Sequence, residues 1–155
     1  MLDRARPGAV PGRSGTANIR IRLTPIARAN IVSFEPKGKF YATPKLETTV
    51  ALTDEKKKSL LPALSKIVAE TIGKPEDYVM VTINPSAILM AGKPGDAAFV
   101  DIRSIGGLST QVNQQLSKKV STLLNQTLGI APNRIYLNFS DVDASNWGWN
   151  GSTFG

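Results

Sequence analysis

The sequence of this chain contains two similar units, which superpose when it is shifted against itself by 56 residues. The shift places Thr71 on Thr127 and Gly73 on Gly129, and it aligns two sets of apolar residues at helical spacing. Each unit is therefore predicted to run as strand, helix, glycine stop and strand. The apolar sets are Leu60, Leu64, Ile67 and Val68 in the first unit, and Leu116, Val120, Leu123 and Leu124 in the second.

The helix in each unit determines how the two strands of that unit pair. A connection that contains a whole helix makes the strands it joins parallel, with a right-handed crossover. We therefore expect an α/β (α+β) fold, in which two βαβ units form one four-stranded mixed sheet with both helices on one face. Pro62 falls inside the first helix and predicts a kink or a late helix start, because proline lacks an N–H donor. The expected strands are 45–51, 78–83, 97–103 and 134–139; the first helix follows Thr53 and ends at Gly73, and the second covers 109–128.

Apolar residues are expected on both faces of this sheet. Helices that cover one face leave the other face to solvent, where polar residues normally alternate with the buried ones. An apolar second face therefore predicts burial against another subunit, and we expect an oligomer. Val79, Val81, Ile135 and Leu137 are expected on one face, and Met80, Ile83, Tyr136 and Phe139 on the other.

The composition excludes several kinds of active site. The chain has no cysteine and no histidine, which rules out disulfides, thiolate nucleophiles, Ser-His-Asp triads and zinc bound by those residues. No metal site is expected. No apolar run approaches the roughly 18 residues of a membrane helix, so no membrane span is expected either. Chemistry must use carboxylates, Lys, Arg, Tyr or a chain terminus.

Basic charge is concentrated at the N-terminus. Residues 1–43 hold eight Lys or Arg against two acidic residues, whereas the rest of the chain is nearly neutral. With several Pro and Gly and no apolar periodicity, this segment predicts a disordered extension over 1–41. It fits an organelle transit peptide, an arm that touches nucleic acid or an anionic membrane, upstream residues that are never translated, or a solvated tail. We expect no nucleic-acid partner, and a location in the cytoplasm or secretion without a signal peptide, with organelle targeting as the alternative.

Four segments occur in order and at fitting spacing: 73–81 (GKPEDYVMV), 103–107 (RSIGG), 134–139 (RIYLNF) and 146–154 (NWGWNGSTF). Together they resemble the macrophage migration inhibitory factor family of the tautomerase superfamily, over about residues 42–155. The resemblance implies a homotrimer whose sheets surround a central channel. It also implies a domain at 42–155 that follows the extension at 1–41.

The resemblance implies keto–enol tautomerisation of small aromatic α-keto acids such as phenylpyruvate, and of dopachrome-type substrates, with no cofactor. The base in that family is the secondary amine of an N-terminal proline, and desolvation and a nearby cation keep its pKa low. Lys74 would hold the substrate carboxylate and help to lower that pKa. Ile105 would present its backbone to the ligand, Tyr136 and Asn138 would come from the adjacent subunit, Trp147, Trp149 and Phe154 would line the apolar mouth, and Tyr78 would lie at its rim.

Each of these residues also has a plain structural interpretation. Lys74 follows a helix stop, where a solvated cation is common. Tyr136 and Asn138 alternate along a strand, and the tryptophan pair could pack at an interface without touching a ligand.

The sequence departs from the family at the catalytic proline. Aligning Thr48-Thr49-Val50 with the end of the family's first strand places Ala42 in that position, and Pro44 follows two residues later. Both lie inside the chain, where a peptide nitrogen has its lone pair delocalised and cannot act as a base. We therefore expect catalysis only if Pro44 becomes N-terminal. The alternative is a non-catalytic, trimeric, cytokine-like binding protein with a blocked active site and a receptor as partner.

Overall fold

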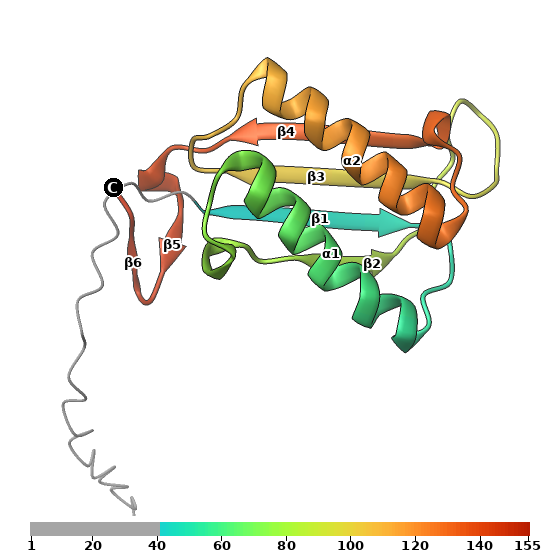
Figure 1. Ribbon diagram of the computed structural model, residues 1–155, viewed down its shortest axis with the longest axis horizontal. Helices are drawn as coiled ribbons and strands as arrows, with labels where there is room; N and C mark the ends of the chain where they lie inside the picture. The colour runs from blue at the N-terminus through green and yellow to red at the C-terminus, as the bar shows by residue number, and fades with distance from the viewer. Residues whose placement is uncertain (1–40) are drawn as a thin grey trace, which may run out of the picture. The chain divides into compact units, whose positions relative to one another are not determined.

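The computed structural model describes residues 41–155, which form a four-stranded mixed sheet with two helices packed on one face (Figure 1). The strand order is β2-β1-β3-β4; β1 is parallel to β2, β3 is parallel to β4, and β1 and β3 are antiparallel. The predicted fold is confirmed. The elements are β1 (Ala42–Thr48), α1 (Asp54–Ile72), β2 (Thr82–Pro85), β3 (Ala98–Ser104), α2 (Thr110–Leu128), β4 (Ile135–Asp141), β5 (Gly148–Trp149) and β6 (Ser152–Thr153), with 3-10 turns η1 (Glu76–Tyr78), η2 (Pro132–Arg134) and η3 (Ala144–Asn146).

The sequence repeat is also a structural repeat. β1 and β3, α1 and α2, and η1 and η2 each begin and end at positions related by the same shift along the chain. The hydroxyls of Thr53 and Ser109 accept a backbone N–H from the first turn of their helices, at 3.3 and 3.2 Å. Gly73 and Gly129 end the helices in the left-handed region, with φ of 79° and 72°.

Two predicted strand positions are wrong. β1 starts at Ala42 rather than at residue 45, because it pairs with β3 along its whole length and then turns where the Thr48 hydroxyl accepts the N–H of Val50 at 3.2 Å. β2 covers only Thr82–Pro85, because the preceding residues form η1 and a single bridge between Val79 and Ala42. α1 begins at Asp54, so the late start suggested by Pro62 is also wrong.

The core fills the space between the helices and the sheet. Leu60, Leu64, Leu116 and Leu124 from the helices are fully buried, as are Leu46, Val100 and Ile102 from the strands. Ile83 and Phe139 pack against this core, as do Val81 and Leu137, so the prediction that placed Ile83 and Phe139 on the face opposite to Val81 and Leu137 is wrong. They share a face with Val81 and Leu137 because side chains two residues apart on a strand point the same way.

The sheet face away from the helices is mostly polar. Lys45 forms an ion pair with Glu47 at 2.6 Å, and Arg103 with Asp101 at 2.8 Å. Tyr136 is an exposed aromatic residue on this face, 64% accessible, opposite Phe99 in the β3–β4 register. The face is therefore less apolar than predicted, and the homotrimer stays a prediction because the structure holds one chain.

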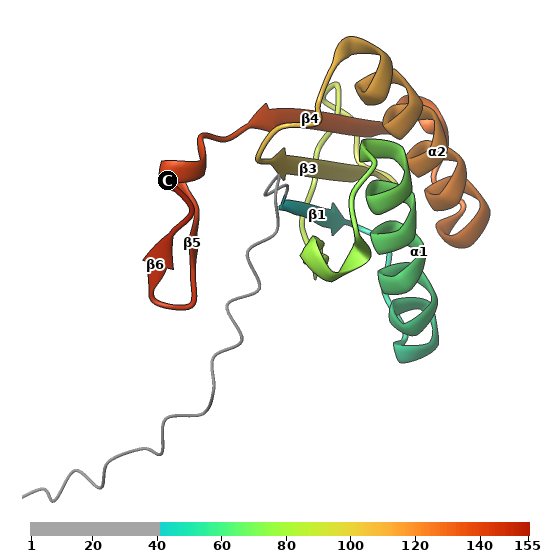
Figure 2. The ribbon, with the colours of Figure 1, turned by 60° about the vertical axis from the view of Figure 1, so that its left-hand side comes forward.

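A short hairpin, β5–β6, extends from the end of the sheet where β1 begins and β4 ends (Figures 1 and 2). Its last residues return to η3 and Trp147, where the Phe154 N–H donates to the Trp147 carbonyl at 3.2 Å. None of the helices in residues 41–155 has the length and apolar character that crossing a membrane requires. The predicted extension at 1–41 lies outside the described residues, except for Tyr41.

Candidate functional site

The end of α1 places Lys74 beside the start of β1. The backbone N–H groups of Gly73 and Lys74 both donate to the Ala69 carbonyl, at 2.9 and 2.8 Å, and so fix the turn that follows the helix. The Lys74 side chain is buried, with 7% of its surface accessible. A plain solvated cation at a helix end would be exposed, so the structure does not support that interpretation.

The Lys74 ammonium contacts three groups next to the start of β1 and at the end of β3. Lys74 Nζ donates to the carbonyl oxygen of Tyr41 at 3.1 Å and to that of Ile105 at 3.5 Å, and it also donates to Ser104 Oγ. Ser104 Oγ in turn donates to the Gly106 carbonyl at 2.6 Å. The structure thus brings together Lys74 and the backbone of Ile105, two of the positions that the resemblance implies for the site.

Burial controls the protonation of this lysine. Removal from water disfavours the ammonium and lowers the pKa of Lys74 to about 8, although the charge of Asp141 acts in the opposite direction. Asp141 itself accepts the N–H of Gly106 at 2.8 Å. Near neutral pH the site therefore holds one partly desolvated cation, which suits a carboxylate ligand.

An aromatic cluster adjoins the lysine. The ring of Tyr41 stacks on Phe154, with centroids 4.1 Å apart and planes 19° apart, and it meets Tyr78 edge-on at 5.0 Å. Trp149 lies beyond Phe154, at a centroid distance of 6.1 Å, and is 62% exposed. Two predicted site residues, Tyr78 and Phe154, therefore contact Tyr41, which the sequence analysis did not single out, and a third, Trp149, contacts Phe154.

The start of β1 carries Ala42, which the sequence alignment places at the position of the family's base. Ala42 lies opposite Ser104 in the β1–β3 register, and its nitrogen is bound to the Tyr41 carbonyl carbon whose oxygen contacts Lys74. Pro44 lies opposite Ile102 and its side chain is fully buried. Of the two positions left open by the sequence, the structure places Ala42 beside Lys74 and Pro44 in the core.

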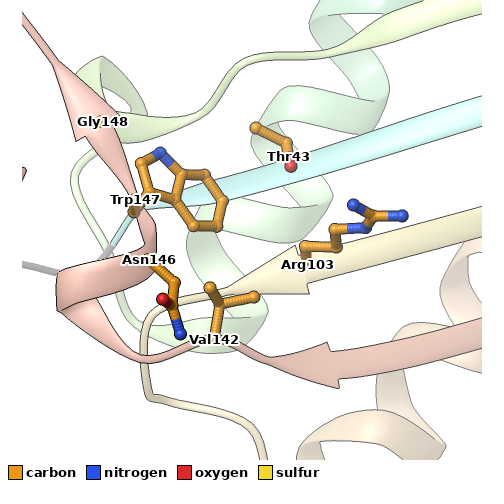
Figure 3. Close-up of a pocket in the computed structure, with 6 residues that line it drawn as sticks. All are labelled: Thr43, Arg103, Val142, Asn146, Trp147 and Gly148. Atoms are coloured by element: carbon orange, nitrogen blue, oxygen red, sulfur yellow. The ribbon is translucent and has the colours of Figure 1, made fainter.

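On the opposite face of the sheet, the same end of β1 borders an open cavity of about 290 Å³. Figure 3 shows the Trp147 ring and the side chains of Thr43 and Arg103 around this space. The predicted mouth residues therefore divide, since Trp147 lies here and Trp149 and Phe154 lie by Tyr41. The lining residues are Thr43, Arg103, Val142, Asn146, Trp147 and Gly148.

Tyr136 and Asn138 lie away from Lys74 within one chain. Tyr136 is opposite Phe99, near the start of β3, whereas Ser104 ends that strand. Five residues of strand separate these points by about 16 Å, at roughly 3.3 Å per residue. Asn138 Nδ2 donates to Asp101 Oδ1 at 2.8 Å. The contribution of Tyr136 and Asn138 to the Lys74 site of a neighbouring copy, which the resemblance implies, stays a prediction.

Among residues 41–155, no group of three or more histidine, cysteine, aspartate or glutamate side chains is placed to hold a metal ion. The polar groups at the site are a lysine, a serine hydroxyl and backbone carbonyls, and the rest are aromatic rings. This set can hold the carboxylate of a small acid and stack its ring.

Two βαβ repeats in one four-stranded sheet, with a buried lysine and an aromatic cluster at the start of the first strand, define a class of small α/β proteins. Comparison with known proteins identifies the family. The model of the family described as "Macrophage migration inhibitory factor (MIF)" matches residues 44–155. The chain belongs to that family, within the tautomerase superfamily.

Relatives support the same assignment. Macrophage migration inhibitory factor from Xenopus tropicalis is 37% identical over 97 residues, which are 62% of this chain and 84% of the relative. A homolog from Trichuris trichiura is 42% identical over 95 residues, 61% of this chain and 83% of the relative. The crystal structure of the macrophage migration inhibitory factor-like protein of Entamoeba histolytica has a TM-score of 0.70 and 36% identity, and the match covers 73% of this chain and 98% of that one.

The sequence analysis missed Tyr41 and the role of Ser104. Ser104 stands within the RSIGG segment, so the motif itself was the available signal. Tyr41 had a weaker signal, namely that it directly precedes the residue aligned with the catalytic position. Its ring contacts come from η1 and from the C-terminal residues, which local pattern does not bring together.

Proposed function

We propose that this chain is a keto–enol tautomerase of small aromatic α-keto acids that is latent as long as residues precede β1. The observation that carries the proposal is the contact between Lys74 Nζ and the carbonyl oxygen of Tyr41, at 3.1 Å. That carbonyl acylates the Ala42 nitrogen. Removing the residues before Ala42 would leave a free amine at the start of β1, beside the buried ammonium of Lys74.

The chemistry follows from that amine. An α-amine has a pKa near 7.7–8.0 in its ordinary state, and partial burial beside Lys74 lowers it, so the neutral base is abundant at neutral pH. It takes a proton from the carbon between the ring and the keto group, and a proton is delivered to the keto oxygen as the enol forms. Lys74 holds the carboxylate, and the backbone of Ile105 contacts the ligand.

A solved relative supports the substrate class. The structure titled "Crystal Structure of Pt0534 Inactivated by 2-Oxo-3-pentynoate" is 25% identical to this chain, with a TM-score of 0.65, over 72% of this chain and 94% of that one. The inactivator named there is a 2-oxo acid. We infer that this chain also takes 2-oxo acids, and that it works as a trimer to which Tyr136 and Asn138 of a neighbouring copy contribute.

The test compares chains that differ only at their N-terminus, with each terminus verified by intact mass. We expect the full chain to be inactive toward phenylpyruvate, the chain that begins at Ala42 to be active, and the same chain carrying Ala42→Pro to be faster. A chain that begins at Pro44 tests the sequence-based prediction directly. The β1–β3 register favours Ala42 as the position of the base. We therefore expect the chain that begins at Pro44 to turn over phenylpyruvate more slowly than the chain that begins at Ala42. Equal turnover by all four chains would show that no free amine at this position is used.

The peptide bond between Tyr41 and Ala42 favours a second function. If the native protein keeps this bond, the site cannot supply an amine, and the chain is a non-catalytic, cytokine-like binding protein with a receptor as partner. N-terminal sequencing of the native protein separates the two. A mature terminus at Ala42 or Pro44 supports the enzyme, and retention of Tyr41 with its preceding residues supports the binding protein.

A further inference from the structure

We propose that Tyr41 is an intrachain ligand of the Lys74 pocket, so that the chain excludes aromatic acids from its own site until this residue is displaced or removed. The inference rests on the proposed function for the identity of the pocket, but it concerns occupancy rather than turnover. Tyr41 contacts the site through both its backbone carbonyl and its ring.

At one end, the Tyr41 carbonyl oxygen takes two donors. The Ile105 N–H donates to it at 2.9 Å and Lys74 Nζ at 3.1 Å. This oxygen thus accepts from one charged donor and one backbone donor. A carboxylate oxygen of a ligand in the same place would accept from the same two donors. The carbonyl therefore occupies the anion position of the pocket.

At the other end, the Tyr41 ring packs against the aromatic residues of the site. It stacks on Phe154 at 4.1 Å and meets the edge of Tyr78 at 5.0 Å. Burial, together with the Tyr78 hydroxyl, raises the pKa of the Tyr41 phenol, which agrees with partial removal of the ring from water. A free aromatic acid would need the space between these two rings.

The distance between the two ends matches the proposed substrates. In Tyr41 the carbonyl carbon, the α carbon and the β carbon lead to the ring. In phenylpyruvate the carboxyl carbon, the keto carbon and the methylene lead to the ring in the same number of bonds. A tyrosine at this position can therefore touch the same donors and the same rings at once, as an aryl-substituted three-carbon acid would.

Because Tyr41 is covalently linked to β1, it competes effectively with free ligands for the site. A ligand held by a short link is present at an effective concentration of roughly millimolar or more. A free acid that binds the open pocket with micromolar affinity would have its apparent affinity lowered many-fold by that competition. Occupancy by Tyr41 therefore blocks ligand binding, whereas acylation of the Ala42 nitrogen blocks catalysis. The block on binding can be removed while the block on catalysis stays.

The experiment measures binding of para-hydroxyphenylpropanoate, which is tyrosine without its amino group and which cannot tautomerise. Calorimetry, with tryptophan fluorescence as a second signal, compares the full chain, full-length Tyr41→Gly, full-length Tyr41→Phe and the chain that begins at Ala42. Tyr41→Phe is the matched control, because it keeps the carbonyl and the ring. Circular dichroism verifies that each variant is folded.

We expect at least a tenfold gain in affinity for Tyr41→Gly and a larger gain for the chain that begins at Ala42, with no gain for Tyr41→Phe. Equal affinity of the full chain and the chain that begins at Ala42 would overturn the proposal. A gain of the same size in Tyr41→Phe would also overturn it, because the ring would then have no role. If the shortened chain binds the probe tightly but does not turn over phenylpyruvate, the proposed function fails and this inference stands.

Discussion

At the scale of single residues, Lys74 and Tyr41 differ in how far the sequence could predict them. Lys74 follows a helix stop in a Gly-Lys-Pro segment, so both its place and its candidate role could be read from local pattern. Its burial could not, because Ser104, Ile105 and Tyr41 reach it from distant parts of the chain. A lysine in such a setting is held by tertiary contacts that local spacing does not contain.

The pKa of Lys74 predicts how stability responds to pH. Burial lowers this pKa from 10.5 to about 8, so between these values the unfolded chain binds more protons at Lys74 than the folded chain does. The free energy of unfolding contributed by this residue therefore rises as pH increases from about 8 toward 10.5. Denaturant unfolding of the wild type and of Lys74→Met, below and within this window, measures the effect.

We expect the wild type to gain stability relative to Lys74→Met as the pH passes 8. The methionine has a similar length and no charge, so contributions from other titrating groups largely cancel in the difference. Parallel stability curves for the two proteins would contradict a lowered pKa. Titration of the Lys74 side-chain carbon resonances by NMR gives an independent value.

At the scale of secondary-structure elements, the helices were predicted best and the strand positions least well. The helices lie where the sequence repeat predicted them, because capping residues and apolar spacing are local signals. The start of β1 was missed by three residues because pairing with β3, rather than local composition, sets it. The choice between Ala42 and Pro44 has another origin, because the alignment places Ala42 at the catalytic position whereas Pro44 is the nearby proline.

In the loop after β3, we expect a methyl group added at Gly107 to lower the stability of the fold strongly. Gly107 has a φ of +79°, and a Cβ there would lie 2.5 Å from Ile72 Cγ2 and 3.5 Å from Lys74 Cε. We expect Gly107→Ala to lower the free energy of unfolding by about 2–4 kcal/mol, combining left-handed strain with overpacking. Gly92→Ala is the control, because Gly92 also has a positive φ but nothing within 4 Å, and only about 1 kcal/mol is expected. Equal losses in urea unfolding would show that the contact with Ile72 is relieved without cost.

The side chain of Arg134 binds the segment before β3 at four points. Arg134 donates to four backbone carbonyls, those of Asp96 at 3.1 Å, Met90 and Gly95 at 3.2 Å, and Lys93 at 3.4 Å. We expect Arg134→Met to speed hydrogen exchange of the amides at 90–97 and to cost about 1–2 kcal/mol. Arg134→Lys should rescue little, because one ammonium cannot reproduce the planar set of donors. Unchanged exchange in Arg134→Met would indicate that the loop is held by other contacts.

At the scale of the whole molecule, one chain holds only part of the proposed site. Lys74, Ile105 and the aromatic cluster lie where β1 begins, whereas Tyr136 lies near the other end of β4, 64% exposed. An assembly with rotational symmetry would bring Tyr136 of one copy to the Lys74 of the next.

Mixed oligomers test this division of the site. Lys74→Met and Tyr136→Ala, each in the chain that begins at Ala42, are expected to lose most binding of para-hydroxyphenylpropanoate when pure. Unfolding the two together in equal amounts and refolding them should restore about one quarter of the wild-type sites, because each site then draws its lysine and its tyrosine from different chains at random. Mixing without unfolding is the control and should restore little. If refolded mixtures show no binding above the pure variants, Lys74 and Tyr136 do not share a site, and Tyr136 serves only in packing.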